Sequence, residues 1–476
     1  VDEFELPGPF SPKLLQAAKH AAHHPISAKR EDFRQSPLFT IDGADARDFD
    51  DAVAGTPTSN GGIKLLVAIA DVAAFVPPHG DVDTEAARRG NSVYLPDRVL
   101  PMLPPALSND ACSLAPDKER LCLVCEMEIF GGTVKRYRFV RGLMRSQQRL
   151  NYDEAAEQIN NHSGPLRWLG DVANAFRQAR QKRGSFMIER PEMRVLINST
   201  GDISSVLSSR NIAHYAIEEC MIAANCCAAD FIIRHHLPAL HRAHPKPPAE
   251  NIAKLRNVLA ELGVDFPAQP AARDFSVALD AISARDAVLG DSLLPLFLGS
   301  LARADYRPDE KIGHFGLSCR RYLHFTSPIR RYPDLLTHRI IIAALEGKPP
   351  PLSIPALERL GTHCSQTEVT ADKANWECQQ RLLCWQARHQ KGMDFECVVS
   401  GVAAFGVFVA VPQLGLDGLV RVSNLPGYWR HDRERQQFVA DQNGQVLGLG
   451  SRLVGRLMEV IPEKGRADFK AVDLSP

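Results

Sequence analysis

Between residues 37 and 55 the chain sets a cluster of acidic residues between two short apolar segments. Those segments are Leu38, Phe39 and Ile41 before the cluster and Ala52, Val53 and Ala54 after it. Asp42 follows the first segment directly, and Asp48, Asp50 and Asp51 fill three of four consecutive positions before the second. Because apolar residues flank the cluster, we expect its carboxylates to lie near a core. Carboxylates this close repel one another, and burying them is costly unless a proton or a bound cation neutralises them.

The composition of this cluster favours a site for a divalent metal ion. Ligand sets made only of oxygen atoms suit Mg²⁺ or Mn²⁺ better than zinc. A calcium loop of the helical-hand type does not fit, because the third and fifth positions counted from Asp42 are Ala44 and Ala46, and the glycine is second rather than sixth. The remaining alternative is a solvated acidic turn. We predict Mg²⁺ as the cofactor, with Mn²⁺ able to replace it.

Six further motifs follow the acidic cluster along the chain. They are Val-Ala-Ile-Ala-Asp-Val at 67–72, Ser-Val-Tyr-Leu-Pro at 92–96, Pro-Met-Leu-Pro at 101–104, Leu-Ser-Asn at 107–109, Glu-Glu-Cys-Met-Ile-Ala-Ala-Asn at 218–225 and Thr-Ser-Pro-Ile-Arg-Arg-Tyr at 326–332. With the pattern Ile-Asp-x5-Asp-x-Asp-Asp-Ala at 41–52, they resemble the ribonuclease II and ribonuclease R (RNB) family of 3′ to 5′ exoribonucleases. The resemblance covers about residues 38 to 391.

The resemblance implies a reaction and roles for the acidic cluster. Members of the family hydrolyse single-stranded RNA processively from its 3′ end and release nucleoside 5′-monophosphates. By resemblance, Asp42, Asp48 and Asp51 bind Mg²⁺. Asp50 is then the acid whose loss should most reduce catalysis, through a second metal ion or through the terminal ribose. Arg330 should contact the phosphate next to the cleaved bond.

Other residues are implied to bind the RNA strand. Tyr94 matches the aromatic residue on which the last base stacks, although a core tyrosine is the alternative. Tyr152 is a candidate for stacking further along the strand, and Glu218 is a candidate acceptor for a 2′-hydroxyl. A second family aromatic is expected near residues 184–188, where the register around Phe186 is ambiguous.

The pattern of residues predicts a mixed sheet up to about residue 149 and mostly helices beyond it. Residues 64–71 read as a buried strand that ends at Asp71, which is better interpreted as a cap for the next turn than as an acid near the metal. Residues 211–236 contain no Gly or Pro and predict a long buried helix. Glu218 and Asn225 share one face of that helix, either beside the RNA or in buried hydrogen bonds. For Arg331, pairing with an acid is the alternative to binding phosphate.

The carboxy-terminal residues read as short strands joined by turns and resemble an S1 domain, a five-stranded OB barrel. By that resemblance Phe405 and Phe408, on either side of Gly406, would stack on bases, although one of them could instead fill the barrel. Arg421 stands where many S1 domains have histidine. We therefore predict an α+β chain with a short helical segment (1–36), an RNB catalytic domain (37–392) and an S1 domain (393–476).

Composition adds few constraints. Lys plus Arg and Asp plus Glu both number 56, so attraction for RNA must come from local segregation of charge. The 11 cysteines are scattered and no signal peptide is recognised, which predicts free thiols and a reducing, cytoplasmic location. We expect a monomer that does not enter a membrane.

Two other functions are compatible with these patterns. One is a single-stranded RNA-binding protein that has lost cleavage, although all four family acids are present. The other is a DNA exonuclease, which equal cleavage of DNA would support.

Overall fold

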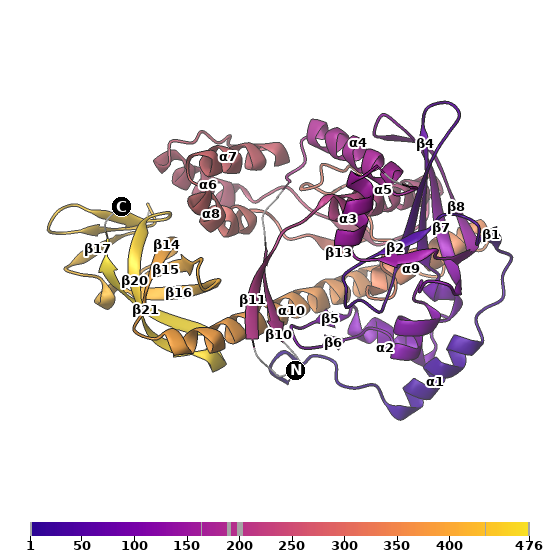
Figure 1. Ribbon diagram of the computed structural model, residues 1–476, viewed down its shortest axis with the longest axis horizontal. Coiled ribbons are helices and arrows are strands. Elements are labelled where there is room, and N and C mark those ends of the chain that lie inside the picture. Colours follow the sequence, from indigo (N-terminus) through magenta and orange to yellow (C-terminus); the bar gives the residue numbers. More distant parts are fainter. Residues whose placement is uncertain (1, 163, 188–191, 198–202, 434, 475–476) are drawn as a thin grey trace.

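The computed structural model describes residues 2–162, 164–187, 192–197, 203–433 and 435–474. It shows a large mixed body and a small barrel at opposite ends of an elongated molecule (Figure 1). Helix α10 (Ile354–Ala387) runs from the body to the barrel. This arrangement confirms the α+β fold class.

A seven-stranded sheet forms the centre of the body, in the order β1-β8-β7-β4-β3-β2-β9. Its strands are β1 (Glu31–Phe33), β2 (Phe39–Ile41), β3 (Asp51–Pro57), β4 (Ile63–Ala70), β7 (Glu119–Phe130), β8 (Thr133–Arg145) and β9 (Gln148–Leu150). Strand β4 is apolar on both faces because both are buried: Leu65 and Val67 pack into one core, and Leu66 and Ala68 into another. This confirms the buried strand expected at residues 64–71.

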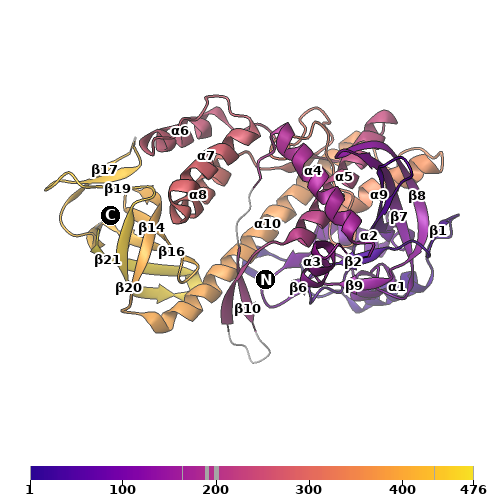
Figure 2. The same cartoon turned by 45° about the horizontal axis from the view of Figure 1, so that its top comes forward.

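Helices cover both faces of this sheet. Helices α3 (Tyr152–Asn160), α4 (Arg167–Arg183) and α5 (Ile212–Arg234) pack on one face, α1 (Pro12–His23) and α2 (Asp81–Arg89) on the other, and α9 (Tyr332–Leu345) contributes to both cores. Helices α6 (Ala249–Glu261), α7 (Ala272–Arg285) and α8 (Ala287–Ser300) form a separate apolar core. Helix α5 is the long buried helix expected from the sequence, and Asn211 caps it. Figure 2 shows α6, α7 and α8 grouped beside the barrel and above α10.

Short strand pairs and single turns complete the body. The pairs are β5 (Val93–Tyr94) with β6 (Val99–Leu100), β10 (Glu192–Ile197) with β11 (Ile203–Ser208), and β12 (His241–Ala243) with β13 (Asp305–Arg307). The turns are η1 (Asp2–Phe4), η2 (Val72–Ala74), η3 (Leu107–Ala111) and η4 (Arg388–Gln390).

The carboxy-terminal strands close into a barrel in the order β14-β15-β16-β21-β20, as expected for an OB fold. The elements of this region are β14 (Asp394–Ala403), β15 (Gly406–Val411), β16 (Leu416–Arg421), η5 (Val422–Asn424), β17 (Trp429–Asp432), β18 (Gln437–Ala440), β19 (Val446–Gly448), β20 (Arg452–Ile461), η6 (Pro462–Lys464) and β21 (Arg466–Asp473). Leu383, Cys384 and Ala387 of α10 belong to the same apolar core as the barrel strands. The barrel is therefore packed on the end of α10 rather than linked loosely to it.

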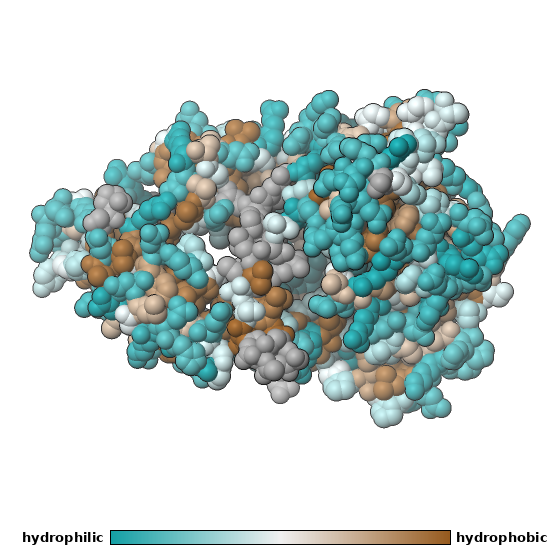
Figure 3. Space-filling model, in the orientation of Figure 1, coloured by the Kyte–Doolittle hydropathy of each residue, from teal (hydrophilic) through white to brown (hydrophobic). Residues whose placement is uncertain are grey.

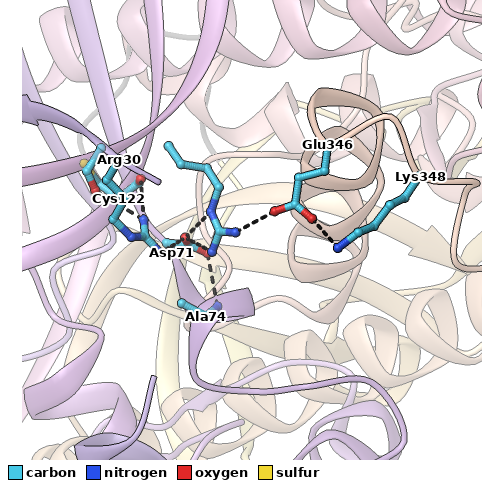
Figure 4. A network of polar contacts seen from close by, with 8 residues as sticks. Arg30, Asp71, Ala74, Cys122, Glu346 and Lys348 are labelled. Atoms are coloured by element: carbon cyan, nitrogen blue, oxygen red, sulfur yellow. Dashed lines mark hydrogen bonds and ion pairs between the residues drawn. The ribbon is translucent and has the colours of Figure 1, made fainter. Parts of the chain in front are cut away.

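Asp71 caps η2, because its side chain accepts a hydrogen bond from the backbone N–H of Ala74 at 3.1 Å. The same buried carboxylate pairs with Arg30 at 2.7 Å and with Arg141 at 3.0 Å, within a network that extends to Glu346 (Figure 4). The interpretation of Asp71 as a cap is confirmed.

Within the described residues, no helix combines the length and the apolar character needed to cross a membrane. All 11 cysteines are free thiols, as expected.

Candidate functional site

Pairing of β2 with β3 brings the ends of the acidic cluster together. Asp42 follows the last residue of β2, and Asp51 is the first residue of β3, which pairs with β2 through Phe39 and Val53. Asp48 and Asp50 lie in the loop between these strands. All four acids line one cleft of about 650 Å³. The residues that the sequence groups within ten positions therefore share one site.

Three of the four acids, Asp42, Asp48 and Asp50, each make a different contact in this cleft. The Oδ1 atom of Asp50 accepts a hydrogen bond from the N–H of Ile329 at 2.8 Å. Its Oδ2 atom lies 3.3 Å from Nε of Arg330 and has no hydrogen-bond partner. Asp42 accepts a hydrogen bond from the N–H of Gly43 at 2.7 Å. The carboxylate of Asp48 accepts a hydrogen bond from the hydroxyl of Tyr94, which is described below.

Burial makes the charged forms of these acids unfavourable. Desolvation raises the pKa of Asp50 well above its ordinary value, although the charge of Arg330 opposes the shift. Burial also raises the pKa of Asp42. Burial and the neighbouring Asp42 raise the pKa of Asp51 to about 7. A cation in the cleft would remove this electrostatic cost.

The donor atoms of the cleft suit a divalent metal ion. In the described part of the chain, no three His, Cys, Asp or Glu side chains already converge as a ligand set. Six carboxylates nevertheless line the cleft, the four acids above together with Asp45 and Glu218, and Oδ2 of the buried Asp50 lacks a hydrogen bond. Oxygen donors of this kind match Mg²⁺ or Mn²⁺.

Arg330 enters the cleft from the segment just before α9. Its side chain is 43% exposed, and its Nη2 donates a hydrogen bond to Oγ of Ser327 at 3.0 Å. Arg331 instead forms a bidentate pair with Asp334, at 2.7 and 2.9 Å. The alternative that Arg331 pairs with an acid is therefore confirmed, and Arg330 remains the arginine available to a ligand in this cleft.

Three tyrosines line the same cleft, and two of them, Tyr94 and Tyr152, are those expected to bind RNA. Tyr94 is 41% exposed, so the alternative of an ordinary core tyrosine is wrong, and its hydroxyl donates a hydrogen bond to Asp48 at 3.2 Å. Tyr152 stacks on His214, with ring centroids 3.8 Å apart. Phe186 packs against Phe275 in a separate apolar core.

Phe186 is thus engaged in packing with Phe275, and residue 188 at the end of the expected range lies outside the described residues. The position of the second family aromatic stays a prediction.

Glu218 and Asn225 both face the cleft and also make buried polar contacts. Burial alone would raise the pKa of Glu218, but Arg180 at 2.9 Å and Arg210 hold it below its ordinary value. The side chain of Asn225 donates to the hydroxyl of Tyr322 at 3.0 Å and accepts from the N–H of Phe325 at 2.9 Å. The polar contacts expected of this helix face are therefore present, and RNA binding beside it stays a prediction.

Sequence reasoning missed several residues of this cleft. Ser327 holds Arg330, and Arg149 donates hydrogen bonds to the carbonyl oxygens of Gly43 and Ala44 in the acidic loop. Ser327 belongs to the Thr-Ser-Pro-Ile-Arg-Arg-Tyr motif, which could have indicated it. No sequence signal marks Arg149.

The barrel presents a second group of expected residues. Phe405 and Phe408 are 54% and 41% exposed, and their rings lie nearly perpendicular with centroids 6.0 Å apart. The alternative that one of them fills the barrel is wrong. Gly406 between them has φ +157°, and a Cβ there would lie 2.3 Å from the carbonyl oxygen of Val420, so no larger residue fits. Arg421 pairs with Asp468 at 3.6 Å.

The barrel and the body are separated by a hollow on the face shown in Figure 3. Polar residues cover most of this face, while apolar residues gather mainly on the barrel and beside the hollow. The exposed phenylalanines and the acidic cleft thus belong to separate parts of the molecule, joined by α10.

Comparison with known proteins gives a consistent result. The model of the RNB domain family matches residues 30–347. Ribonuclease R of Escherichia coli (strain K12) is 40% identical over 471 residues, which cover 94% of this chain and 58% of that protein. Ribonuclease R of Thermotoga maritima is 36% identical and covers 98% of this chain and 69% of that protein. The chain therefore spans little more than half the length of the Escherichia coli protein.

Solved structures match the fold over nearly the whole chain. The apo form of Mycoplasma genitalium RNase R has a TM-score of 0.91 and 25% sequence identity, covering 99% of this chain and 76% of that one. The same enzyme in complex with ribose methylated single-stranded RNA has a TM-score of 0.90. Yeast Ssd1, a pseudonuclease, shares the fold with a TM-score of 0.72 at 20% identity, over 91% of this chain and 54% of that one. From the family match and the ribonuclease R relatives, the chain belongs to the RNB domain family.

Proposed function

We propose that this chain is a hydrolytic 3′ to 5′ exoribonuclease that degrades single-stranded RNA processively and releases nucleoside 5′-monophosphates, with Mg²⁺ as its cofactor. The observation that carries the proposal is that Asp42, Asp48, Asp50 and Asp51 line one cleft together with Arg330 and Tyr94. The ribonuclease R relatives and the RNase R complex with single-stranded RNA support the same reaction and substrate. We further propose that the protein acts as a cytoplasmic monomer.

Phosphodiester hydrolysis needs a nucleophilic water, stabilisation of charge at phosphorus and assistance to the leaving oxygen. In this proposal Asp42, Asp48 and Asp51 hold Mg²⁺, which would supply charge stabilisation and a more acidic water. Arg330 then binds the phosphate, because its guanidinium is partly exposed and suits phosphate oxygens. Asp50 would be the acid whose loss most reduces catalysis, through a second metal ion or through the terminal ribose, and its contact of 3.3 Å would also orient Arg330.

The chain's other residues would position the RNA. The ring of Tyr94 is exposed in the cleft, and its hydrogen bond to Asp48 fixes the ring beside the acidic cluster, where the last base could stack. Tyr152 would stack further along the strand, and Glu218 would accept a hydrogen bond from a 2′-hydroxyl. Phe405, Phe408 and Arg421 would bind the strand at the barrel.

A time course with single-stranded RNA labelled at its 5′ end tests the proposal. With Mg²⁺ we expect a descending ladder and mononucleotide product, and EDTA should abolish both. Asp50→Asn should lower the rate at least about 100-fold, since even residues that only support a metal site cost 10–100-fold when lost. Asp45→Asn is the matched control, because Asp45 lies in the same loop and lines the same cleft without an assigned role. Its rate should stay near that of the wild type.

The same assay distinguishes the alternatives. Intact RNA that remains tightly bound would contradict hydrolysis and indicate a non-cleaving RNA-binding protein. The retained four acids argue against it. A DNA oligonucleotide of the same sequence should remain intact, and equal cleavage of it would indicate a DNA exonuclease instead. Addition of excess unlabelled RNA after binding tests processivity.

A further inference from the structure

Two cysteines far apart in the sequence lie next to each other in the body. The Sγ atoms of Cys226 and Cys319 are 3.8 Å apart, although 93 positions separate the residues. Cys226 belongs to α5, and Cys319 lies in the segment between β13 and α9. A disulfide bond is about 2.0 Å long, so the sulfur atoms need to approach each other by roughly 1.8 Å. Neither thiol has a role in the proposed hydrolysis.

This pair is more accessible than most of the other thiols. Eight of the 11 cysteines are buried, and only Cys226, Cys319 and Cys378 are partly exposed. Cys226 and Cys319 both line a cleft of about 960 Å³ bounded by β8, α4 and α5. Cys125 and Cys227 are also neighbours, but both are buried, and burial raises the pKa of the Cys125 thiol. A small oxidant can therefore reach the pair of Cys226 and Cys319 more easily than any other pair of neighbouring thiols in the described chain.

The charges around Cys319 favour its reaction. A thiolate, not a thiol, is the nucleophile in thiol oxidation. A hydrogen bond from Cys226 lowers the pKa of the Cys319 thiol, and the nearby charges of Arg183 and Arg180 act in the same direction. Arg183 lines the same cleft as the two thiols. Cys319 is therefore the attacking thiol, and Cys226 is placed to resolve the product.

The pair borders the candidate active site. Asn225, next to Cys226, holds Tyr322 and Phe325 through both ends of its side-chain amide. Cys319 begins the segment that continues through these two residues to Arg330. A bond between the thiols would pull the start of this segment toward α5. Displacing a catalytic group by about 1 Å can lower a rate by as much as 100-fold.

We propose that Cys226 and Cys319 form a reversible disulfide on exposure to peroxide, and that this bond slows the reaction in the neighbouring cleft by shifting the segment that carries Arg330. The formation of the bond does not depend on the proposed function. Its effect on rate rests on that function.

The reaction balances with hydrogen peroxide as the oxidant. The Cys319 thiolate attacks one peroxide oxygen, the O–O bond breaks, and a sulfenic acid and hydroxide form. The Cys226 thiol then attacks the sulfenic sulfur, the S–S bond forms, and the S–O bond breaks. The two thiol protons leave with the oxygens as two water molecules. The thiol pair loses two electrons and the peroxide gains them, and a dithiol reductant reverses the change.

The test compares the full chain before and after treatment with hydrogen peroxide. Free thiols are blocked, the protein is digested without reductant, and the peptides are identified by mass spectrometry. We expect one cross-linked peptide pair containing Cys226 and Cys319, which dithiothreitol separates. The rate of RNA hydrolysis should fall at least threefold on oxidation and recover with dithiothreitol. Cys226→Ser and Cys319→Ser should each prevent the cross-link and the loss of rate.

Cys378→Ser provides the matched control, because Cys378 is the third partly exposed cysteine and lies on α10. This variant should behave like the wild type. A cross-link between Cys125 and Cys227, or oxidation without any cross-link, would overturn the proposal. A cross-link of Cys226 with Cys319 that leaves the rate unchanged would overturn the regulatory effect. If the reduced protein does not hydrolyse RNA, the proposed function fails together with the effect on rate, while the peptide map still decides whether the disulfide forms.

Discussion

The protonation of one buried acid, Asp51, makes the free energy of unfolding depend on pH. Its pKa in the folded, metal-free protein is about 7, against 3.8 as the ordinary value. From pH about 4 to about 7, the folded state therefore binds a proton that the unfolded chain has released, so the free energy of unfolding falls as the pH rises through this range. With EDTA present, the wild type should lose roughly 1–3 kcal/mol relative to Asp51→Asn between pH 5 and pH 8.

Urea unfolding of both proteins at the two pH values measures this difference. Asp45→Asn, in the same loop, should keep the wild-type dependence on pH. An equal change in the free energy of unfolding between the two pH values for the wild type and Asp51→Asn would contradict a raised pKa for Asp51.

Asp71 is a buried acid with a structural role. Its carboxylate is fully buried between Arg30 and Arg141, whose side chains are 9% exposed. Removing the charge takes away the carboxylate that pairs with the buried Arg30 and leaves Arg141 with Glu346, its other partner, so Asp71→Asn should lower the free energy of unfolding by about 3–5 kcal/mol. Denaturation by urea tests this, and the rate of RNA hydrolysis per folded molecule should not change.

Asp394→Asn is the control for this variant, because Asp394 pairs with Arg456 at the surface, where water screens the pair, and its loss should leave the free energy of unfolding nearly unchanged. If Asp71→Asn remained stable but lost activity, Asp71 would belong to the catalytic site instead.

At the scale of elements, the barrel exposes the aromatic rings of Phe405 and Phe408, which are not part of its core. The barrel core is filled by other side chains, such as Val407 and Val409. Replacing the exposed Phe405 or Phe408 with alanine should therefore leave the melting temperature nearly unchanged. Each replacement should weaken RNA binding by about 1–3 kcal/mol, the usual contribution of one base stacked on an aromatic ring.

Fluorescence anisotropy with labelled RNA measures this effect, in an Asp50→Asn background so that the RNA stays intact. Met458→Ala is the control, since Met458 is 41% exposed on β20 of the same barrel. Equal affinity of all these variants would show that the RNA does not stack on Phe405 or Phe408.

For the whole molecule, a net charge of zero does not prevent binding to a polyanion. Only the local field along the bound strand matters. We expect the logarithm of the RNA association constant to fall linearly with the logarithm of the salt concentration, by at least about tenfold between 50 and 200 mM salt. An uncharged analogue of the RNA backbone should show no such slope. Affinity for RNA that does not depend on salt would contradict binding through phosphates.

Much of the fold could be predicted from local sequence. The buried strand β4 and the long helix α5 follow from apolar runs and from the absence of Gly and Pro, which are local features. The closed barrel was expected from the resemblance to S1 domains. The boundaries at residues 36 and 392 stay predictions, although β1 at Glu31–Phe33 pairs with β8 in the large sheet.

The sequence by itself determined which chemical groups the site contains, because the acids at 42–51 and the arginine at 330 are recognisable as ligands for cations and phosphate. Only the tertiary structure decided how they are used. In the folded chain, Ile329 and Arg330 contact Asp50. Arg180 pairs with Glu218, and Cys319 lies beside Cys226. These contacts join residues tens to hundreds of positions apart, so they depend on how the sheet, α5 and the segment before α9 pack, which no local pattern encodes.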